Sequence, residues 1–377
     1  MSPRGVAILG STGSIGTTAL RVLDRQGARF RVTALTAFNN VALLGEQVAQ
    51  FHPTFVGLVG NGVTARPGWR CGPSCLVDAA TRDDVDIVIN AVVGAAGLDA
   101  TLAALELGKR VALANKETLV MAGALVEAAR ARGGGEIIPV DSEHSAILQC
   151  LTGRPGVQVR RVILTASGGP FRRWRSDEIE RATLADALQH PTWRMGRKIT
   201  VDSATLANKA LEVIEAHFLF GLSFEQIDIV VHPQSIVHSF VEFVDGSVLA
   251  QLGIPSMELP VLYALTHPER VPDTGVPPFD PVELSPLTFE RVRMADFPAL
   301  RLGVDAGRKG GAAPAVFNGA NEAAVSLFLE GRIGFADIPR AIEAALEELG
   351  SLAGDSREGI LAADEAARRH VRERFRC

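Results

Sequence analysis

Short apolar runs alternate with helical patterns through residues 1–140 of the chain. The run at 86–94, DIVINAVVG, is almost entirely apolar, which is typical of a strand buried on both faces of a parallel sheet. Helical spacing follows the first run through Leu20 and Val22, and it returns between Leu98 and Leu107. This alternation predicts an N-terminal doubly wound, Rossmann-like α/β domain. Its predicted strands are 6–10, 31–35, 56–59, 86–94, 111–114 and 136–140.

The pattern changes after residue 140. Apolar and polar positions alternate within 236–252, where Asp245-Gly246 supplies a hairpin turn, so we expect half-buried antiparallel strands and a central α+β domain at 141–266. Prolines crowd 267–291, which predicts an extended linker crossing a surface. Alanine-rich amphipathic segments then predict a small C-terminal helical domain at 292–377.

The most unusual stretch of the central domain is HPTWRMGRKITVDSATLANKALE, from His190 to Glu212. It begins as a loop at 190–197 that holds an aromatic residue between a proline and a glycine. A helix should follow, capped by Asp202 or Ser203 and ending at Gly221. Such a helix places Asn208, Lys209 and Glu212 on one face. That triplet alone indicates a solvated face with an ordinary Lys–Glu pair; the aromatic loop and a second acidic cluster favour a functional site.

Charge and composition exclude several function classes. The 377 residues carry a formal net charge of −5 with no long basic run, which argues against a nucleic-acid partner. No apolar run approaches membrane-spanning length, and the N-terminus lacks a signal-peptide layout, so no membrane association is expected. Four cysteines are too few and too scattered for a disulfide framework, which favours a reducing cytoplasm.

The first predicted strand runs into GSTGSIG, with glycines at 10, 13 and 16, and then into a helix. This layout lets a dinucleotide pyrophosphate approach the backbone at a helix N-terminus. The spacing is G-x-x-G-x-x-G, so a tight turn without a ligand remains an alternative. No acidic residue follows the second strand, where Thr36 to Asn40 read TAFNN, and this weakly favours a 2′-phosphorylated cofactor.

Two polar clusters follow predicted strand ends, where open α/β sheets bind ligands. They are Asn115-Lys116-Glu117 and Asp141-Ser142-Glu143-His144. With Glu212, Asp141 and Glu143 give three carboxylates and no zinc-type ligands, a set suited to Mg²⁺ or Mn²⁺. Asp141 could instead be only the N-cap of a helix over 143–151.

Other residues offer the hydroxyl, amide, imidazole and ammonium donors that a phosphate monoester needs. Any one of these side chains is more often structural, and His190 could simply bond a backbone carbonyl. Trp193 and Met195 could be core residues, although their loop fits a lid better. The candidate donors are Ser167, His190, Ser203, Asn208 and Lys209.

These segments together resemble the 1-deoxy-D-xylulose-5-phosphate reductoisomerase family. The resemblance spans nearly the whole chain in the family's order. It rests on GSTGSIG, LANKETLV, PVDSEHSAI, TASGGPF, HPTWRMGRKITVDSATLANKALEVIEA, VVHPQSIVHSF, DGSVLAQLGIPSM and FNGANEAAV.

The resemblance implies an NADPH- and metal-dependent enzyme acting on 1-deoxy-D-xylulose 5-phosphate. The product would be 2-C-methyl-D-erythritol 4-phosphate, formed by a retro-aldol and aldol rearrangement followed by hydride transfer. The metal would be Mn²⁺ or Mg²⁺, with Co²⁺ as a further candidate, and the enzyme would be a cytoplasmic homodimer with a sugar phosphate as its small-molecule partner.

The resemblance also implies roles for individual residues. The catalytic set would be Lys116, Asp141, Glu143, His190 and Glu212, of which Asp141, Glu143 and Glu212 are the metal ligands. Substrate contacts would come from Lys116, Ser142, Glu143, Ser167, His190, Trp193, Ser203, Asn208, Lys209 and Glu212. Cofactor contacts would come from Thr12, Gly13, Ser14, Ile15, Phe38, Asn39, Asn40, Asn115, Glu117, Gly196 and Met257.

One departure from the family and two rival classes bear on this interpretation. Phe38-Asn39-Asn40 carries no basic residue, so we expect a weaker preference for NADPH over NADH than is usual in the family. A semialdehyde-type dehydrogenase would need a cysteine nucleophile, and only Cys150 is near the predicted site. A non-catalytic NADPH sensor would leave the acidic cluster and the lid unexplained.

Overall fold

The computed structural model describes residues 2–60, 64–153, 158–193 and 195–376, and the chain forms two compact units. The first unit comprises Met1–Thr118, Ala124–Leu148 and Ser256–Pro278, and the second comprises Leu119–Gly123, Gln149–Pro255 and Phe279–Cys377. The segment Ser256–Pro278 thus groups with the first unit, whereas the sequence boundaries assign it to the central domain and the linker. Arg194, in the predicted lid, lies outside the described residues.

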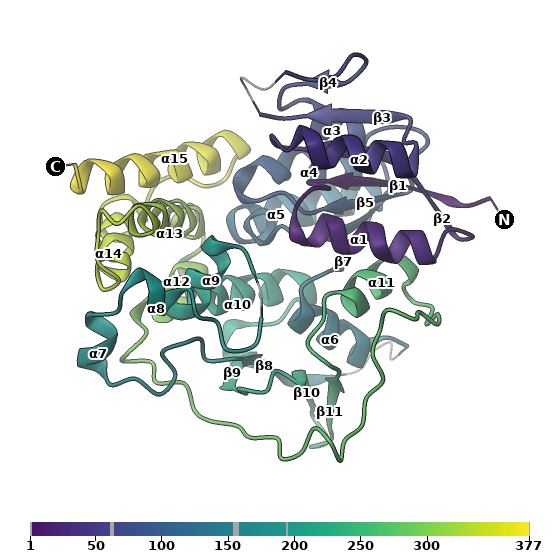
Figure 1. Ribbon diagram of the computed structural model, residues 1–377. Coiled ribbons are helices and arrows are strands. Elements are labelled where there is room, and N and C mark those ends of the chain that lie inside the picture. The colour runs from purple at the N-terminus through teal and green to yellow at the C-terminus, as the bar shows by residue number, and fades with distance from the viewer. Residues whose placement is uncertain (1, 61–63, 154–157, 194, 377) are drawn as a thin grey trace. The chain divides into compact units, whose positions relative to one another are not determined.

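The first unit is built on a seven-stranded sheet in the order β4-β3-β2-β1-β5-β6-β7, with every pair parallel (Figure 1). The strand order reverses between β1 and β5, which is the switch point where doubly wound sheets bind ligands. The predicted α/β class is therefore confirmed. The strands are β1 (Arg4–Leu9), β2 (Phe30–Ala37), β3 (Phe55–Leu58), β4 (Arg70–Cys71), β5 (Ile87–Asn90), β6 (Arg110–Leu113) and β7 (Glu136–Pro139).

The apolar runs form these strands because helices bury them. Ile8, Leu35, Ile87 and Ile89 are completely shielded from solvent. The short strand β4 was not predicted, since its two residues carry no periodic pattern. The helices of this part of the chain are α1 (Ser14–Arg25), α2 (Val41–Phe51), α3 (Cys75–Ala80), α4 (Leu98–Glu106), α5 (Lys116–Gly133) and α6 (Ser142–Leu151), with a 3₁₀ turn at Gly94–Gly97.

Helix α11 (Glu258–Thr266) joins the first unit from far along the chain, and it packs against α1, β6 and β7. Arg4 and Arg110 both donate to the carbonyl of Leu265 near the end of this helix, at 2.6 and 3.2 Å. Beyond the helix, the buried carboxylate of Asp273 accepts hydrogen bonds from Arg25 at 2.7 Å and from the backbone of Gly275 at 2.8 Å. These long-range contacts explain why the segment does not belong to the unit that precedes it.

The second unit contains a four-stranded sheet in the order β11-β10-β8-β9, in which only β8 and β9 are parallel. The hairpin predicted at Asp245-Gly246 is confirmed, since Gly246 has a φ of 87° and Asp245 accepts from the backbone of Ser247. The strands are β8 (Val159–Ala166), β9 (Ile227–Val231), β10 (Val237–Phe243) and β11 (Val248–Leu252).

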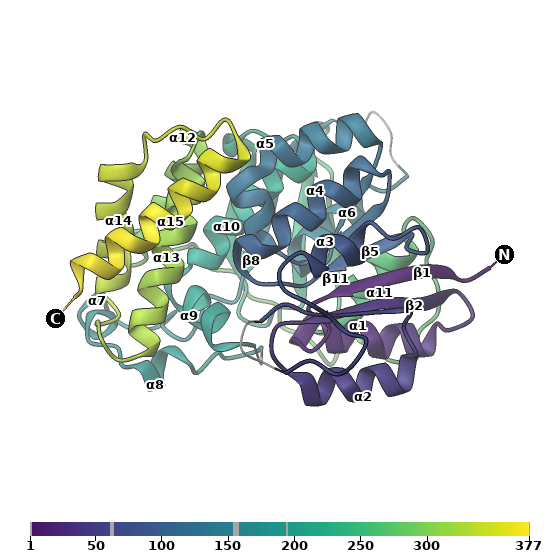
Figure 2. The same ribbon diagram turned by 90° about the horizontal axis from the view of Figure 1, so that it is seen from above.

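Helices complete the second unit, and α13 packs against both α14 and α15 (Figure 2). The predicted helical character of the C-terminal segment is confirmed. No helix among the described residues is long and apolar enough to cross a membrane. The helices are α7 (Ser176–Glu180), α8 (Leu184–Ala187), α9 (Arg197–Thr205), α10 (Ala207–Phe220), α12 (Pro298–Lys309), α13 (Ala313–Leu329), α14 (Asp337–Leu349) and α15 (Arg357–Arg374), with a 3₁₀ turn at Phe224–Gln226.

The single helix predicted from Asp202 or Ser203 to Gly221 is wrong at its start. Helix α9 begins after Gly196, so Asp202 and Ser203 lie inside it rather than at a cap. Leu206 then adopts the left-handed conformation, with a φ of 59°, and separates α9 from α10. Leucine rarely takes this conformation, so nothing in the local sequence marks the break. The hydroxyl of Thr205 accepts from the backbone of Ala207 at 3.2 Å and so satisfies one donor at the start of α10.

Asp273 offers a direct test of how the segment Ser256–Pro278 is held. Burial alone would raise the pKa of this carboxyl, but hydrogen bonds from Gln26, Gly275 and Arg25 hold it below its usual value. We expect Asp273→Ala to lower the free energy of unfolding by about 1.5–3 kcal/mol at neutral pH, because it leaves donors without a charged acceptor. The loss should shrink at acidic pH, as the carboxyl of the parent protein becomes protonated.

Glu269→Ala is the matched control, since Glu269 pairs with Arg29 at an exposed position in the same segment. Its unfolding free energy should change by less than about 1 kcal/mol. Urea denaturation followed by circular dichroism measures both variants, and equal losses would contradict the anchoring role of Asp273.

Candidate functional site

The glycine turn of the first unit leaves a helix N-terminus open to an anion. Gly10 has a φ of 85°, and Gly13 is the N-cap of α1 without a side-chain cap or an acidic residue in the first turn. A β-carbon on Gly16 would lie 2.4 Å from the carbonyl oxygen of Gly10, so only glycine allows this approach of helix and strand. The uncapped backbone N–H groups can therefore bind a phosphate, as the motif predicts.

A buried side-chain pair that the sequence did not predict braces this turn. The hydroxyl of Ser11 donates to Gln47 at 2.7 Å, and the Gln47 amide donates back to the Ser11 carbonyl at 2.9 Å. The two residues are 36 positions apart, so no local pattern links them.

The end of β2 places the three predicted cofactor residues at the surface. Phe38 is 64% exposed, and Asn39 is exposed beside it. Asn40 caps α2 by accepting from the backbone of Leu43 at 3.2 Å. Within the described part of the chain, Asn39 makes no side-chain hydrogen bond and Asn40 uses only its oxygen, so both side-chain NH2 groups can reach a ligand at this strand end.

Asn115 and Lys116 follow β6. The Asn115 side chain caps α5 through the backbone of Thr118 and donates to the carbonyls of Val92 and Gly94, each at 3.0 Å. Its amide is thus occupied by the protein, and its cofactor contact stays a prediction. Lys116 forms an ion pair with Asp141, which follows β7.

Asp141 serves two purposes at once. Its Oδ1 accepts from the backbones of Glu143 and His144, at 3.1 and 3.3 Å, so the predicted capping interpretation is correct for this oxygen. Its Oδ2 faces Lys116. Next to it, Ser142 donates to the Glu143 carboxylate. The first unit therefore presents two carboxylates and an ammonium at the ends of adjacent parallel strands.

In the second unit, α10 buries the remaining predicted carboxylate. Glu212 is 1% exposed and Lys209 is 4% exposed, so the solvated-face interpretation is wrong. Lys209 and Asn208 both donate to Glu212, and Lys209 also donates to the carbonyl of Thr165 at 2.5 Å. A buried carboxylate of this kind requires such partners.

The turn after β8 brings the phosphate candidates of the second unit together. Gly168 and Gly169 have φ values of 83° and 64°, which no other residue type adopts easily. A β-carbon on Gly169 would lie 2.7 Å from the carbonyl of Ser203, so the turn packs directly against α9. We name Thr165–Gly169 the β8 turn; it contacts Lys209, His190 and Ser203.

His190 fixes the direction of the Ser167 hydroxyl. The backbones of Thr192 and Trp193 donate to His190 Nδ1, at 3.1 and 2.8 Å. A neutral His190 therefore carries its hydrogen on Nε2 and donates it to Ser167 Oγ at 3.0 Å. The backbone of Gly169 donates to the same oxygen at 3.2 Å. Both acceptor positions are filled, so Ser167 can offer its own hydrogen to a ligand.

Ser203 and the residues of the predicted lid border the same turn. The Ser203 hydroxyl is half-buried and forms no hydrogen bond within the described part of the chain. Trp193 and Met195 are half-buried, and the hydroxyl of Thr192 holds the loop to the carbonyl of Pro233 at 3.2 Å. A hydroxyl donor and a tethered aromatic loop thus border the β8 turn.

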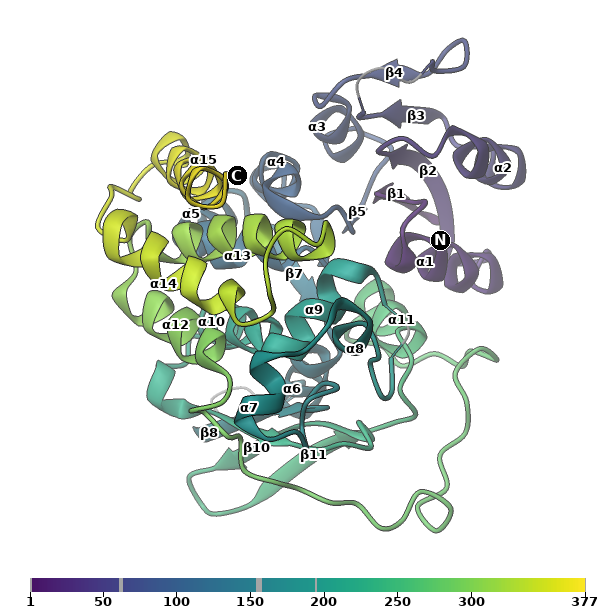
Figure 3. The ribbon, with the colours of Figure 1, turned by 60° about the vertical axis from the view of Figure 1, so that its left-hand side comes forward.

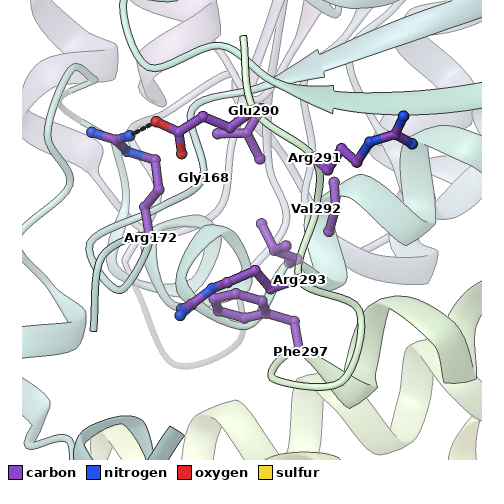
Figure 4. Close-up of a pocket in the computed structure, with 9 residues that line it drawn as sticks. Gly168, Arg172, Glu290, Arg291, Val292, Arg293 and Phe297 are labelled. Carbon is purple, nitrogen blue, oxygen red and sulfur yellow. Dashed lines mark hydrogen bonds and ion pairs between the residues drawn. The ribbon is translucent and has the colours of Figure 1, made fainter. Parts of the chain in front are cut away.

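A cavity of about 80 Å³ lies behind Gly168 (Figure 4). Two of its three arginines are bonded: Arg172 pairs with Glu290, and Arg293 donates to the carbonyls of Trp174 and Phe171. The third, Arg291, is exposed. The bond from Arg172 to Glu290 ties the linker to the chain after the β8 turn, so this part of the cavity supports the turn.

Comparison with known proteins assigns the chain to a family. The model for 1-deoxy-D-xylulose 5-phosphate reductoisomerase matches residues 6–123. The model for the C-terminal domain of this enzyme matches residues 137–220, and a further model, for the DXP reductoisomerase C-terminal domain, matches residues 252–370. The chain belongs to the 1-deoxy-D-xylulose 5-phosphate reductoisomerase family.

Members of this family resemble the chain over nearly its full length. The reductoisomerase of Synechococcus sp. (strain JA-2-3B'a(2-13)) is 50% identical over 98% of this chain and 96% of its own. That of Heliobacterium modesticaldum is 50% identical over 98% and 97%. A crystal structure of DOX-P reductoisomerase with NADPH, fosmidomycin and magnesium has a TM-score of 0.92 at 39% identity, covering 99% of this chain and 98% of that one. The Zymomonas mobilis reductoisomerase with NADPH has a TM-score of 0.90 at 41% identity, covering 99% of both.

The protonation state of His190 is the first testable feature of this reductoisomerase site. Burial lowers the pKa of His190 to about 4. We expect the imidazole to stay neutral, with its hydrogen on Nε2, at every pH well above that value. Long-range ¹H–¹⁵N spectra measure this, with His190→Gln identifying the signal.

Because its folded pKa lies below the unfolded value of 6.5, protonation of His190 favours the unfolded chain. Its contribution to stability should be complete above about pH 6.5 and lost as the pH falls towards 4. A titration midpoint near 6.5 in the folded protein, or a hydrogen on Nδ1, would contradict the hydrogen bonds described above.

Proposed function

We propose that the chain catalyses the NADPH- and divalent-metal-dependent isomerisation and reduction of 1-deoxy-D-xylulose 5-phosphate to 2-C-methyl-D-erythritol 4-phosphate. The observation that carries the proposal is the arrangement of phosphate donors around the β8 turn in a member of the reductoisomerase family. The relatives named for this activity, and the crystal structures with NADPH and magnesium, support it.

The substrate phosphate would lie against the β8 turn. Ser167 has its hydrogen free to donate, Ser203 makes no competing bond among the described residues, and Asn208 follows on α10. Lys209, held between Thr165 and Glu212, adds positive charge without being exposed. Binding the phosphate here would supply energy remote from the reacting carbons, which serves to hold the fragments in place.

Asp141, Glu143 and Glu212 would hold the divalent cation. The three residues could hold a metal ion together, and their oxygen-only donors fit Mg²⁺ or Mn²⁺, with Co²⁺ as a further candidate. A bound cation of this kind stabilises negative charge on substrate oxygens. The ion pair of Lys116 with Asp141 and the bond from Ser142 to Glu143 orient the two carboxylates of the first unit.

The remaining residues would orient the substrate and cofactor and exclude water. Lys116 and Ser142 would contact the hydroxyl and carbonyl end of the substrate, while one C–C bond breaks and another forms in the retro-aldol and aldol steps. NADPH, which supplies a hydride when bound, would lie with its pyrophosphate on the α1 N-terminus; Glu117, Gly196 and Met257 would be further contacts. Trp193 would cover the substrate and protect the intermediate aldehyde from water.

We also propose that the enzyme is a cytoplasmic homodimer. On the edge strand β11, Val248 is 50% exposed and Leu252 is 37% exposed. Such an apolar edge favours pairing with a second chain. Cys71, Cys75 and Cys150 form no disulfide among the described residues, which agrees with a reducing compartment.

The rival dehydrogenase mechanism finds no support in Cys150. Its thiol is buried within α6, at 6% exposure, and is not available as a nucleophile. The NADPH-sensor alternative leaves the buried Glu212 and its partners without a purpose.

Glu212→Gln tests the proposed metal ligand while preserving its shape. We expect turnover to fall by at least about 100-fold, because the side chain loses the charge that would bind the cation. NADPH affinity should change little. A coupled assay of NADPH oxidation with 1-deoxy-D-xylulose 5-phosphate, with and without Mn²⁺, measures turnover, and cofactor fluorescence measures binding.

Glu215→Gln is the matched control, because Glu215 is also buried on α10, one turn further along. This variant should keep Mn²⁺-dependent turnover within about threefold of the parent. Near-normal turnover of Glu212→Gln at saturating Mn²⁺ would reject the metal assignment.

A further inference from the structure

A buried hydrogen bond joins α9 to α13 within the second unit. Asp202 of α9 is 1% exposed, and its Oδ1 accepts from the Asn321 amide at 2.9 Å. Its Oδ2 forms an ion pair with Lys198, one turn earlier on the same helix, at 2.9 Å. Figure 3 shows α9 beside α13, and the two helices are in contact. Asp202 therefore connects the helix after the lid loop to the C-terminal helices.

The opposite contact of α9 is with the β8 turn. Gly169 approaches the carbonyl of Ser203 and the Cα of Ala204 so closely that a β-carbon would lie 2.7 and 3.2 Å away. Because Ser203 and Ala204 pack directly against Gly169, two residues after Ser167, the position of α9 determines where Ser203 lies relative to Ser167.

Helix α9 fully buries two small apolar side chains. Val201 and Ala204 are its fully buried apolar residues, and neither is large. Asn321 is completely buried, and its Oδ1 has no hydrogen-bond partner among the described residues. Burying an amide oxygen without a hydrogen-bond partner lowers stability. The hydrogen bond from the Asn321 amide to the Asp202 carboxylate offsets this loss.

We propose that Asn321 is a positioning residue for the substrate phosphate. Through Asp202 it fixes the position of α9, and so holds the Ser203 hydroxyl at the β8 turn. The inference rests on the proposed function, since it requires Ser203 to contact the phosphate. It gives the C-terminal helical segment an indirect part in substrate affinity, through α9, over and above its packing.

Asn321→Ala is the test, and Asn318→Ala is its matched control. Asn318 lies one turn earlier on α13, is equally buried, and donates at 3.0 Å to Asp364 on α15 instead of to α9. We expect Asn321→Ala to raise KM for 1-deoxy-D-xylulose 5-phosphate about tenfold and to change kcat by less than about threefold. Asn318→Ala should lower the melting temperature to a similar extent but leave KM within about twofold of the parent.

Coupling shows whether Asn321 acts through Asp202. In the Asp202→Ala background, Asn321→Ala should raise KM by less than about twofold more, since the bond is already absent. Full additivity of the two KM effects would overturn the proposal, as would equal KM changes in Asn321→Ala and Asn318→Ala.

Ser203→Ala separates this inference from the proposed function. A raised KM in Ser203→Ala with an unchanged KM in Asn321→Ala would refute the positioning role and leave the phosphate site intact. An unchanged KM in Ser203→Ala would instead refute the phosphate role of Ser203, and the positioning role with it.

Discussion

The burial of the Glu212 carboxylate is the constraint on which the second unit depends. An ionised carboxylate at 1% exposure is tolerated only when charged and polar donors surround it. Lys209 and Asn208, one helical turn away on α10, supply those donors. Lys209 also bonds the carbonyl of Thr165 at the end of β8, so compensating the charge fixes the helix to the sheet. The β8 turn begins at Thr165, so this bond also sets the position of the residues that we propose as phosphate donors.

Backbone shape then decides which side chains can meet at the turn. The left-handed conformation of Leu206 divides one polar sequence into two helices, so Ser203 and Lys209 approach the turn from separate elements. The two glycines after Ser167 allow α9 to pack against the backbone. Strained or glycine-only conformations of this kind concentrate where side chains must converge on a ligand.

Much of this arrangement could be predicted from the sequence, because its signals are local. The parallel sheet follows from apolar runs that alternate with helical patterns, and the tight turn before α1 follows from glycines at the junction of a strand and a helix. The family's motifs indicate which side chains are candidates for binding the metal, the substrate and the cofactor. Asp141 shows the limit of such reasoning: the capping interpretation is correct for one oxygen, the metal-ligand interpretation stays a prediction, and the pairing of the other oxygen with Lys116 was not predicted.

What the sequence could not predict depends on contacts between distant residues. The placement of α11 in the first unit depends on Arg25 and Asp273, which are 248 positions apart. The tether from Asn321 to Asp202 spans 119 positions. The break at Leu206 has no residue signal, because it is imposed by tertiary packing on a side chain that ordinarily continues a helix.

We propose that Asp141, Glu143 and Glu212 hold one divalent cation. Anomalous diffraction from crystals grown with Mn²⁺, NADPH and a phosphonate analogue of the substrate would locate this ion. We expect one strong peak with an oxygen of each carboxylate within about 2.0–2.4 Å. A peak bound by Asp141 and Glu143 while Glu212 stays paired with Lys209 alone, or no peak at these residues, would contradict the claim.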